Sequence, residues 1–91
     1  MKASKEHYII IGRGEVSEYA LRAIVALRGL AEEEVLVLKG RGEGISKAVD
    51  VYNEVRSRIG EALQLVNVSI GSERAGRKKL PFIEIRIKMT V

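Results

Sequence analysis

The chain has 91 residues, a length at which we expect one domain around a single core. Sixteen Lys and Arg against 12 Asp and Glu give a net charge of +4, which favours a polyanionic partner over an acidic small molecule. The absence of Cys excludes disulfides, a thiolate nucleophile and the usual zinc sites. Without a signal peptide or an apolar run of membrane-spanning length, we expect a soluble, cytoplasmic protein with no membrane partner.

The first two thirds of the chain alternate between strand and helix patterns. The run Tyr-Ile-Ile-Ile over 8–11 predicts a first strand, and an unbroken apolar run favours a buried one. Apolar residues at helical spacing over 16–30 predict a first helix with acidic residues in its first turn. The run 35–38 predicts a second strand, and a second apolar stripe over 45–59 predicts a helix that closes at Gly60.

The last third of the chain changes to a period of two. Apolar and polar residues alternate over 66–70 and 83–89, so both segments are predicted as half-buried strands of a long hairpin. Their connection, 71–81, holds four cations and one anion and no large apolar anchor, so we expect a mobile cationic loop. Residues 1–91 are therefore predicted to form one α+β domain, a two-layer β-α-β-α-β-β unit with helices on one sheet.

A basic, glycine-rich loop is expected between the second strand and the second helix. Over 39–44 the sequence reads Lys-Gly-Arg-Gly-Glu-Gly. Such a loop can bring backbone N–H groups and cations close to a phosphate, because glycine has no Cβ to hold an anion away. It is neither a Walker loop nor a full dinucleotide fingerprint, since Ile45 stands in place of a third glycine. The plainer alternative is a tight connection before a helix.

Three segments together resemble the Alba family of small archaeal chromatin proteins. They are Gly-Arg-Gly-Glu-Gly-Ile-Ser-Lys-Ala-Val-Asp over 40–50, Gly-Arg-Gly over 12–14 and Val-Ser-Ile-Gly-Ser-Glu over 68–73. The resemblance implies a fold similar to the C-terminal domain of translation initiation factor 3 and a homodimer, or a heterodimer with another paralogue. It also implies a nucleoid-associated protein that coats and compacts double-stranded DNA. Family members also bind RNA, so an RNA-binding protein or ribonucleoprotein subunit is the alternative.

The resemblance also implies which side chains contact nucleic acid. The family's central loops match 12–14 and 39–42, and its flexible arms match 74–79. Without the resemblance, the cation run 74–79 would be interpreted as a solvated turn. Loops that follow parallel strands emerge at the same sheet edge, so Arg13 and Arg41 are expected to face one groove. The expected nucleic-acid-binding residues are Arg13, Lys39, Arg41, Lys47, Arg74, Arg77, Lys78 and Lys79.

The chain departs from the family pattern in both central loops. Many members carry a Lys-Lys pair whose acetylation weakens DNA binding, and the matching positions here are Arg13 and Gly14. Because the arginine side chain is not acetylated, we do not expect this regulation here, and the change suggests a divergent second paralogue. Glu43 stands where other members often have a basic residue, so we expect the arms to carry more of the affinity.

An apolar interface between subunits is expected on the second helix and the last strands. These segments are rich in Val, Ile and Leu, and a monomer of this size would leave an apolar patch that a two-fold dimer covers. The resemblance places packing between dimers near Ile59, where some members carry a bulkier Phe. The expected interface residues are Tyr52, Val55 and Ile59.

No cofactor, metal site or catalytic group is expected. His7 has no carboxylate or Ser partner close in sequence and is expected to be an ordinary surface histidine. Tyr8, Tyr19 and Tyr52 lie in apolar patterns, so we expect them in the core or an interface and not as stacking platforms for bases. An enzyme is disfavoured because no nucleophile with a base, carboxylate pair or metal cluster is recognisable.

Overall fold

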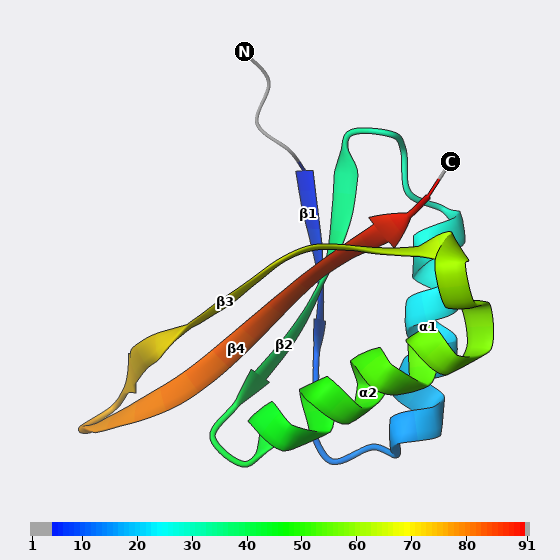
Figure 1. The fold of residues 1–91 in the computed structure, drawn as a ribbon. Coiled ribbons are helices and arrows are strands. Elements are labelled where there is room, and N and C mark those ends of the chain that lie inside the picture. Colours follow the sequence, from blue (N-terminus) through cyan, green and yellow to red (C-terminus); the bar gives the residue numbers. More distant parts are fainter. Residues whose placement is uncertain (1–4, 91) are drawn as a thin grey trace.

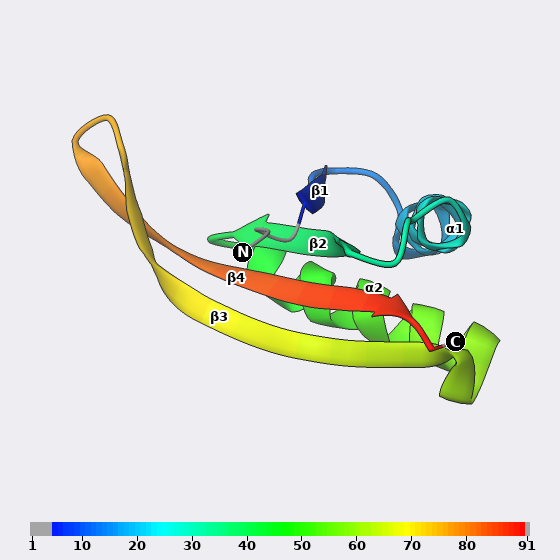
Figure 2. The same ribbon diagram turned by 90° about the horizontal axis from the view of Figure 1, so that it is seen from above.

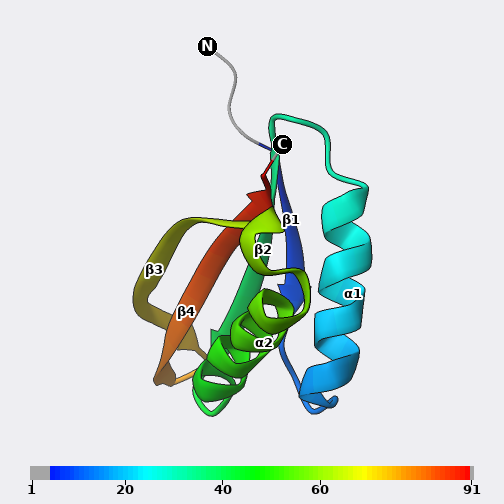
Figure 3. The ribbon, with the colours of Figure 1, turned by 45° about the vertical axis from the view of Figure 1, so that its right-hand side comes forward.

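The computed structural model describes residues 5–90. The elements, in chain order, are β1 (Lys5–Ile10), α1 (Val16–Arg28), β2 (Glu34–Arg41), α2 (Gly44–Ile59), the short 3-10 helix η1 (Gly60–Ala62), β3 (Leu63–Ala75) and β4 (Lys78–Met89) (Figure 1). The strands form one sheet in the order β1-β2-β4-β3, in which β1 and β2 are parallel and the other neighbours antiparallel. Both long helices lie over one face of this sheet (Figure 3). The α+β fold and the element order are as predicted.

The core lies between the helices and the sheet face that they cover. Alternate residues of β2 and β4 point into it, because side chains on a strand alternate between its two faces. Each fully buried aliphatic side chain contributes about 1.5–3 kcal/mol to folding. The largest fully buried side chains that pack in this core are Leu27, Leu36, Leu38, Val51, Val55 and Ile87.

The two long helices begin and end close to the predicted residues. In α1, Glu18 lies in the first turn and Arg28 in the last, which complements the helix dipole. The helix ends at Gly29, whose N–H donates to the carbonyl oxygen of Ala26, and the N–H of Leu30 donates to the carbonyl oxygen of Leu27. α2 closes at Gly60, as predicted, and the φ of +56° there is one that glycine adopts without strain. Local sequence signals were therefore sufficient for both helices.

β1 is an edge strand, and the prediction that it is buried was wrong. Ile9 faces the helices and is buried, and so is Ile11 just after the strand, but Tyr8 and Ile10 are 47% and 52% exposed. The helices cover only one face of the sheet, so the alternate residues of this strand remain at the surface. An unbroken apolar run does not by itself distinguish this arrangement from burial on both faces.

β2 is longer than predicted and contains residues that were expected in a loop. Its pairing with β4 continues through Lys39, Gly40 and Arg41, so the connection to α2 consists of Gly42 and Glu43 alone. A Cβ at position 40 would lie 2.1 Å from the carbonyl oxygen of Gly44 at the start of α2. Gly40 therefore permits α2 to pack directly on β2. This is the structural role that the plainer alternative, a tight connection before a helix, assigns to a glycine.

The segment 71–81 is a paired ribbon, and the prediction of a loop there was wrong. β3 and β4 stay in register to the pair Ala75 and Lys78, and only Gly76 and Arg77 connect them. Gly76 has a φ of +65°, as the first connecting residue of a type II′ hairpin turn requires. The ribbon extends past the end of β2 (Figure 1) and bends away from the rest of the sheet (Figure 2).

β3 carries apolar side chains that the helices do not cover. A bulge at Val66 interrupts its pairing with β4, and beyond it Val68 and Ile70 pair with the buried Ile85 and Ile83. Val68 and Ile70 therefore lie on the same face as the core, yet they are 48% and 79% exposed. The alternation over 66–70 predicted a strand correctly, but it did not reveal that its apolar face lies beyond the reach of α2.

Candidate nucleic-acid interface

The loops that follow β1 and β2 meet at one edge of the sheet. Arg13 and Arg41 line a common hollow of about 360 Å³, together with Glu43 and Lys47. This proximity follows from the parallel pairing of the two strands, whose carboxyl ends lie at the same edge. Among residues 5–90 the Arg13 side chain has no hydrogen bond or ion pair, and it is exposed. Its guanidinium is therefore available to an anion in the hollow.

The first loop is held by two side chains from the helices. The hydroxyl of Tyr19 accepts hydrogen bonds from the backbone N–H of Gly12 at 2.8 Å and of Gly14 at 3.3 Å. The ammonium of Lys47 donates to the carbonyl oxygens of the same two glycines, at 2.9 and 2.8 Å. Lys47 was expected to contact nucleic acid; its ammonium is engaged with this loop, and a contact with nucleic acid stays a prediction. Sequence reasoning assigned Tyr19 to the core and missed its polar contact with the loop.

The glycines of both loops serve packing within the chain. A Cβ at Gly14 would lie 3.1 Å from the Tyr19 ring. In the second loop, the N–H of Gly42 donates to the carbonyl oxygen of Pro81, and that of Ile45 to the carbonyl oxygen of Gly42. These four loop amides therefore have partners inside the protein.

Lys39 lies on the sheet face away from the helices and outside the hollow. Its ammonium is 2.9 Å from an oxygen of Glu73 on β3 and 3.3 Å from one of Glu84 on β4, and it lies 4.9 Å from the centre of the Phe82 ring. The hydrogen bond to Glu73 and, after it, the one to Glu84 raise the pKa of Lys39. Two carboxylates therefore hold the Lys39 ammonium in this structure, and its contact with phosphate stays a prediction.

Arg41 lines the hollow and also pairs with Glu73. Its guanidinium donates to Glu73 at 2.9 Å, and 47% of its side chain is exposed. Hydrogen bonds from Lys39 and then from Arg41 hold the pKa of Glu73 below its usual value. Glu73 therefore binds both basic residues of β2, Lys39 with one carboxylate oxygen and Arg41 with the other.

A charged network continues across the uncovered face of the sheet. Arg86 on β4 donates to Glu6 on β1, to Glu84 and to Ser69. The hydrogen bonds to Glu6 and then to Glu84 raise the pKa of Arg86, and the bond from Arg86 lowers the pKa of Glu6. Val37 lies between Tyr8 and Arg86 in the strand register and is fully buried. The alternating charges over 84–88 were a signal of this network that strand prediction alone did not use.

The four cations of the ribbon are separate from the hollow and exposed. None of them has a hydrogen bond or ion pair within the described part of the chain. They stand at or beside the hairpin turn, at the end of a ribbon that projects from the sheet (Figure 2). These residues are Arg74, Arg77, Lys78 and Lys79.

The predicted subunit interface has to be corrected at Val55. This side chain is fully buried in the core of its own chain and has no surface left for a partner. Tyr52 and Ile59 are partly buried and pack at the margin of the core. Among the exposed apolar side chains, Val49 belongs to α2, and Leu65, Val68 and Ile70 belong to β3.

His7 has a partner that its sequence neighbours do not show. Its imidazole lies 3.2 Å from a carboxylate oxygen of Glu34 on the adjacent strand. The N–H of Ala31 and then His7 lower the pKa of Glu34 through hydrogen bonds. His7 is 44% exposed in its side chain, so it is a surface histidine as expected, with an ion-pair partner when it is protonated.

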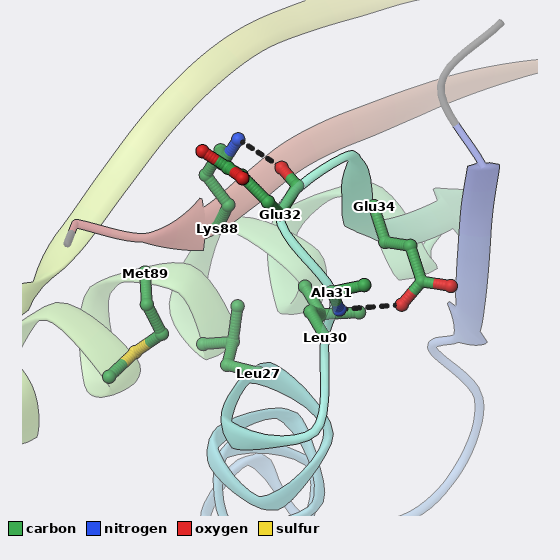
Figure 4. A pocket seen from close by; sticks show the side chains of 7 residues that line it. All are labelled: Leu27, Leu30, Ala31, Glu32, Glu34, Lys88 and Met89. Atoms are coloured by element: carbon green, nitrogen blue, oxygen red, sulfur yellow. Dashed lines mark hydrogen bonds between the residues drawn. The ribbon is translucent and has the colours of Figure 1, made fainter. Parts of the chain in front are cut away.

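A second hollow, of about 340 Å³, lies at the end of α1 (Figure 4). Leu27, Leu30 and Met89 line its apolar part. At its rim, Lys88 donates to the carbonyl oxygen of Glu32 and Glu34 accepts from Ala31, so both charged groups have internal partners. No cluster of three or more His, Asp or Glu that fits a metal ion occurs in residues 5–90, and no helix there is long and apolar enough to cross a bilayer.

Comparison with known proteins identifies relatives in sequence and in structure. A family model for Alba matches residues 7–72. Two curated relatives, both called DNA/RNA-binding protein Alba 2, come from Saccharolobus solfataricus and Saccharolobus shibatae. Each is 44% identical over 73 residues, which is 80% of this chain and 80% of the relative.

Two solved structures have the same fold. Alba from Thermoplasma volcanium matches with a TM-score of 0.78 at 24% identity, over 90% of this chain and 99% of that one. ALBA1 from Trypanosoma brucei matches with a TM-score of 0.77 at 13% identity, over 99% of this chain and 72% of that one. These likenesses concern the fold alone, and the family follows from the sequence matches. The chain belongs to the Alba family.

Proposed function

We propose that this chain binds double-stranded DNA without sequence preference and coats it. The observation that carries the proposal is the placement of Arg13 and Arg41 at one hollow beside a ribbon that bears four exposed cations. Arginine forks and lysine ammonium groups bind phosphate, and phosphate contacts carry no base code. The names of the two curated relatives, which include DNA/RNA-binding, support a nucleic acid as the ligand.

The salt dependence of binding tests this proposal. Arg13 and the four ribbon cations have no partner within residues 5–90, and Arg41 makes a sixth cation if a phosphate displaces Glu73. Six neutralised phosphates give a slope of about −5 in the logarithm of affinity against the logarithm of salt concentration. Titration of labelled duplex DNA between low and moderate salt measures this slope. Binding that does not change with salt contradicts the proposal.

We infer that the protein acts as a dimer, either of identical chains or with another Alba paralogue. Val68 and Ile70 of β3 and Val49 of α2 are exposed apolar side chains, and Tyr52 and Ile59 are partly buried at the margin of the core. In a monomer of 91 residues these apolar side chains would stay exposed to water, which is unfavourable. A two-fold contact would bury the same patch on both subunits. A dimer would present two hollows and two ribbons to one duplex.

Sedimentation separates the two contacts that we propose for the apolar surface. Ile70→Ser places a hydroxyl at the most exposed apolar position of β3, so we expect it to weaken the dimer. Ile59→Ala is expected to reduce packing between dimers on DNA and to leave the dimer intact. An unchanged sedimentation coefficient for both variants, with and without DNA, would remove this surface from the assembly.

RNA is the second candidate ligand, since both curated relatives are called DNA/RNA-binding. The cations described above suit the backbone of either polymer. Competition between duplex DNA and structured RNA at matched salt distinguishes the two. For the cellular setting we propose the cytoplasm and the nucleoid, with residues 1–91 acting as one domain and without a catalytic role. Crosslinking in cells, followed by sequencing of the bound nucleic acid, tests the ligand and the location together.

A further inference from the structure

We infer that Glu73 is an internal competitor for phosphate, which occupies the anion position at Arg41 until nucleic acid displaces it. This inference rests on the proposed nucleic-acid binding. One carboxylate oxygen of Glu73 is 2.9 Å from the Arg41 guanidinium and the other is 2.9 Å from the Lys39 ammonium. A guanidinium and an ammonium bind phosphate oxygens at the same distances and with the same donors. Glu73 therefore marks where a phosphate would lie.

The strand register brings this carboxylate within reach of Arg41. Arg41 and Gly71 both pair with Phe82, from opposite sides of β4, and Glu73 follows two residues later on the same face of β3. A Cβ at position 71 would lie 3.0 Å from the Phe82 ring, so glycine there gives the ring room. The Arg41 side chain then spans the distance between β2 and β3 to reach Glu73. The contact is built into the sheet and does not depend on a loose loop.

The contact is weak enough for a polyanion to displace. The side chains of Arg41 and Glu73 are 47% and 30% exposed, and ion pairs at this level of exposure contribute little to stability because water screens them. A duplex offers a row of phosphates whose binding releases condensed counterions, which a single carboxylate cannot match. Once Glu73 is displaced, Lys39 keeps Glu84 as a partner at 3.3 Å, whereas no other acid is paired with Arg41 within residues 5–90. Displacement therefore frees about one cation.

A neutral isostere tests the competition directly. Glu73→Gln keeps the shape of the side chain and removes its charge. We expect affinity for duplex DNA at about 0.1 M salt to rise about threefold to tenfold, and the salt slope to become steeper by up to about 0.9, the share of one phosphate contact. Fluorescence anisotropy over a salt series measures both. Glu61→Gln removes the same charge from η1, at the other end of β3, and is the matched control, with little change expected.

The Arg41→Ala background distinguishes competition from a general charge effect. Without Arg41, Glu73 no longer competes with phosphate for that guanidinium. In the Arg41→Ala background, Glu73→Gln should therefore raise DNA affinity only as much as the control Glu61→Gln does. A full gain in the Arg41→Ala background would overturn the inference. In the protein that keeps Arg41, a gain by Glu73→Gln no larger than that of Glu61→Gln, or weaker binding, would also overturn it. Glu73→Asp, which keeps the charge on a shorter side chain, should give a partial gain and serves if the Gln variant is unstable.

The two proposals fail in different ways. If the unmodified protein binds duplex DNA with a steep salt dependence but Glu73→Gln behaves like Glu61→Gln, the competitor role is wrong and DNA binding stands. If the unmodified protein shows no salt-dependent binding of DNA or RNA, the proposed function fails before the variants are compared. Thermal unfolding of each variant confirms that a change in affinity is not caused by loss of the fold.

Discussion

Tyr19 and Gly40 show how single residues position the basic loops. The Tyr19 ring packs in the core, while its hydroxyl accepts from the backbone of the loop that carries Arg13. Gly40 lets the start of α2 lie against β2, because any side chain would meet the carbonyl of Gly44. Both residues act indirectly, because they position the segments that carry Arg13 and Arg41. Their substitution should therefore affect stability or loop order and leave the number of phosphate contacts unchanged.

Tyr19→Phe is expected to lower the free energy of unfolding by about 1 kcal/mol, because the loop amides lie near the surface where water can replace the hydroxyl. Affinity for duplex DNA should fall by about fivefold, since the loop must then be ordered on binding. The salt slope should stay the same because Arg13 still neutralises a phosphate. Tyr52→Phe is the control, as its hydroxyl has no hydrogen bond within residues 5–90. A slope reduced as far as in Arg13→Ala would contradict this role.

Gly40→Ala is expected to destabilise the protein by about 1–3 kcal/mol, the usual cost of forcing atoms into a packed site. Urea unfolding measures the change. The new Cβ would lie 2.1 Å from a backbone oxygen, which cannot move without shifting α2. Gly29→Ala is the matched control, because its Cβ would lie 3.7 Å from the nearest atom and its φ of −94° suits any residue. Equal stability of the two variants would show that α2 adjusts freely.

At the scale of elements, the basic side chains on the β3–β4 ribbon differ from those at the end of β2. The ribbon holds four cations that have no partner within residues 5–90, whereas both basic side chains at the end of β2 are bound by Glu73. The ribbon is held by its backbone pairing down to a two-residue turn. Its cations are therefore carried on a defined strand pair, and they should contribute more to affinity than the cations of β2.

The double variant Arg77→Ala and Lys78→Ala should lose more affinity than Arg41→Ala. Removing two free cations should reduce the salt slope by about 1.8, while Arg41→Ala should reduce it by less than 0.9 because Glu73 already offsets its charge. Salt titrations with duplex DNA give both values. Arg28→Ala with Arg56→Ala removes the same charge from the two helices and controls for net charge. Equal losses for the ribbon and the β2 variants would contradict this division.

At the scale of the whole molecule, the sheet separates an apolar face from a charged one. The molecule measures 43 × 36 × 16 Å, so it is flat and has a large surface for its mass. One face packs under the helices, and the other carries the network of Glu6, Arg86, Glu84, Lys39 and Glu73. Because this network joins all four strands through side chains, it contributes to the stability of the sheet as well as to its charge.

The network predicts a loss of stability in acid. Hydrogen bonding by Arg86 lowers the pKa of Glu6 in the folded state from its ordinary 4.5, so the unfolded state binds the proton more readily. The stabilising contribution is complete above about pH 5 and is lost as pH falls through the folded-state pKa. Urea unfolding from pH 7 to pH 3 should show this fall, and Glu6→Gln should make the curve flatter. Glu61→Gln should leave its shape unchanged; stability that rises in acid would contradict the prediction.

Much of the fold was predictable from local patterns. The helical stripes over 16–30 and 45–59 and the glycines that end them predicted α1 and α2 closely. The period-two pattern over 83–89 predicted β4, although not its extension to Lys78. The ribbon was missed because charged residues and glycines lower strand propensity, and only pairing between β3 and β4 overcomes that preference.

The amino-acid sequence by itself determined the element order, the family and the basic character of the two loops and the ribbon, because periodicity, glycine placement and charge are local properties of a chain. Only the tertiary structure decided which cations remain free. Arg41 and Glu73 are 32 residues apart and meet only because β4 aligns β2 with β3. Ion pairs between distant segments depend on strand register, and register is set by packing of the whole sheet.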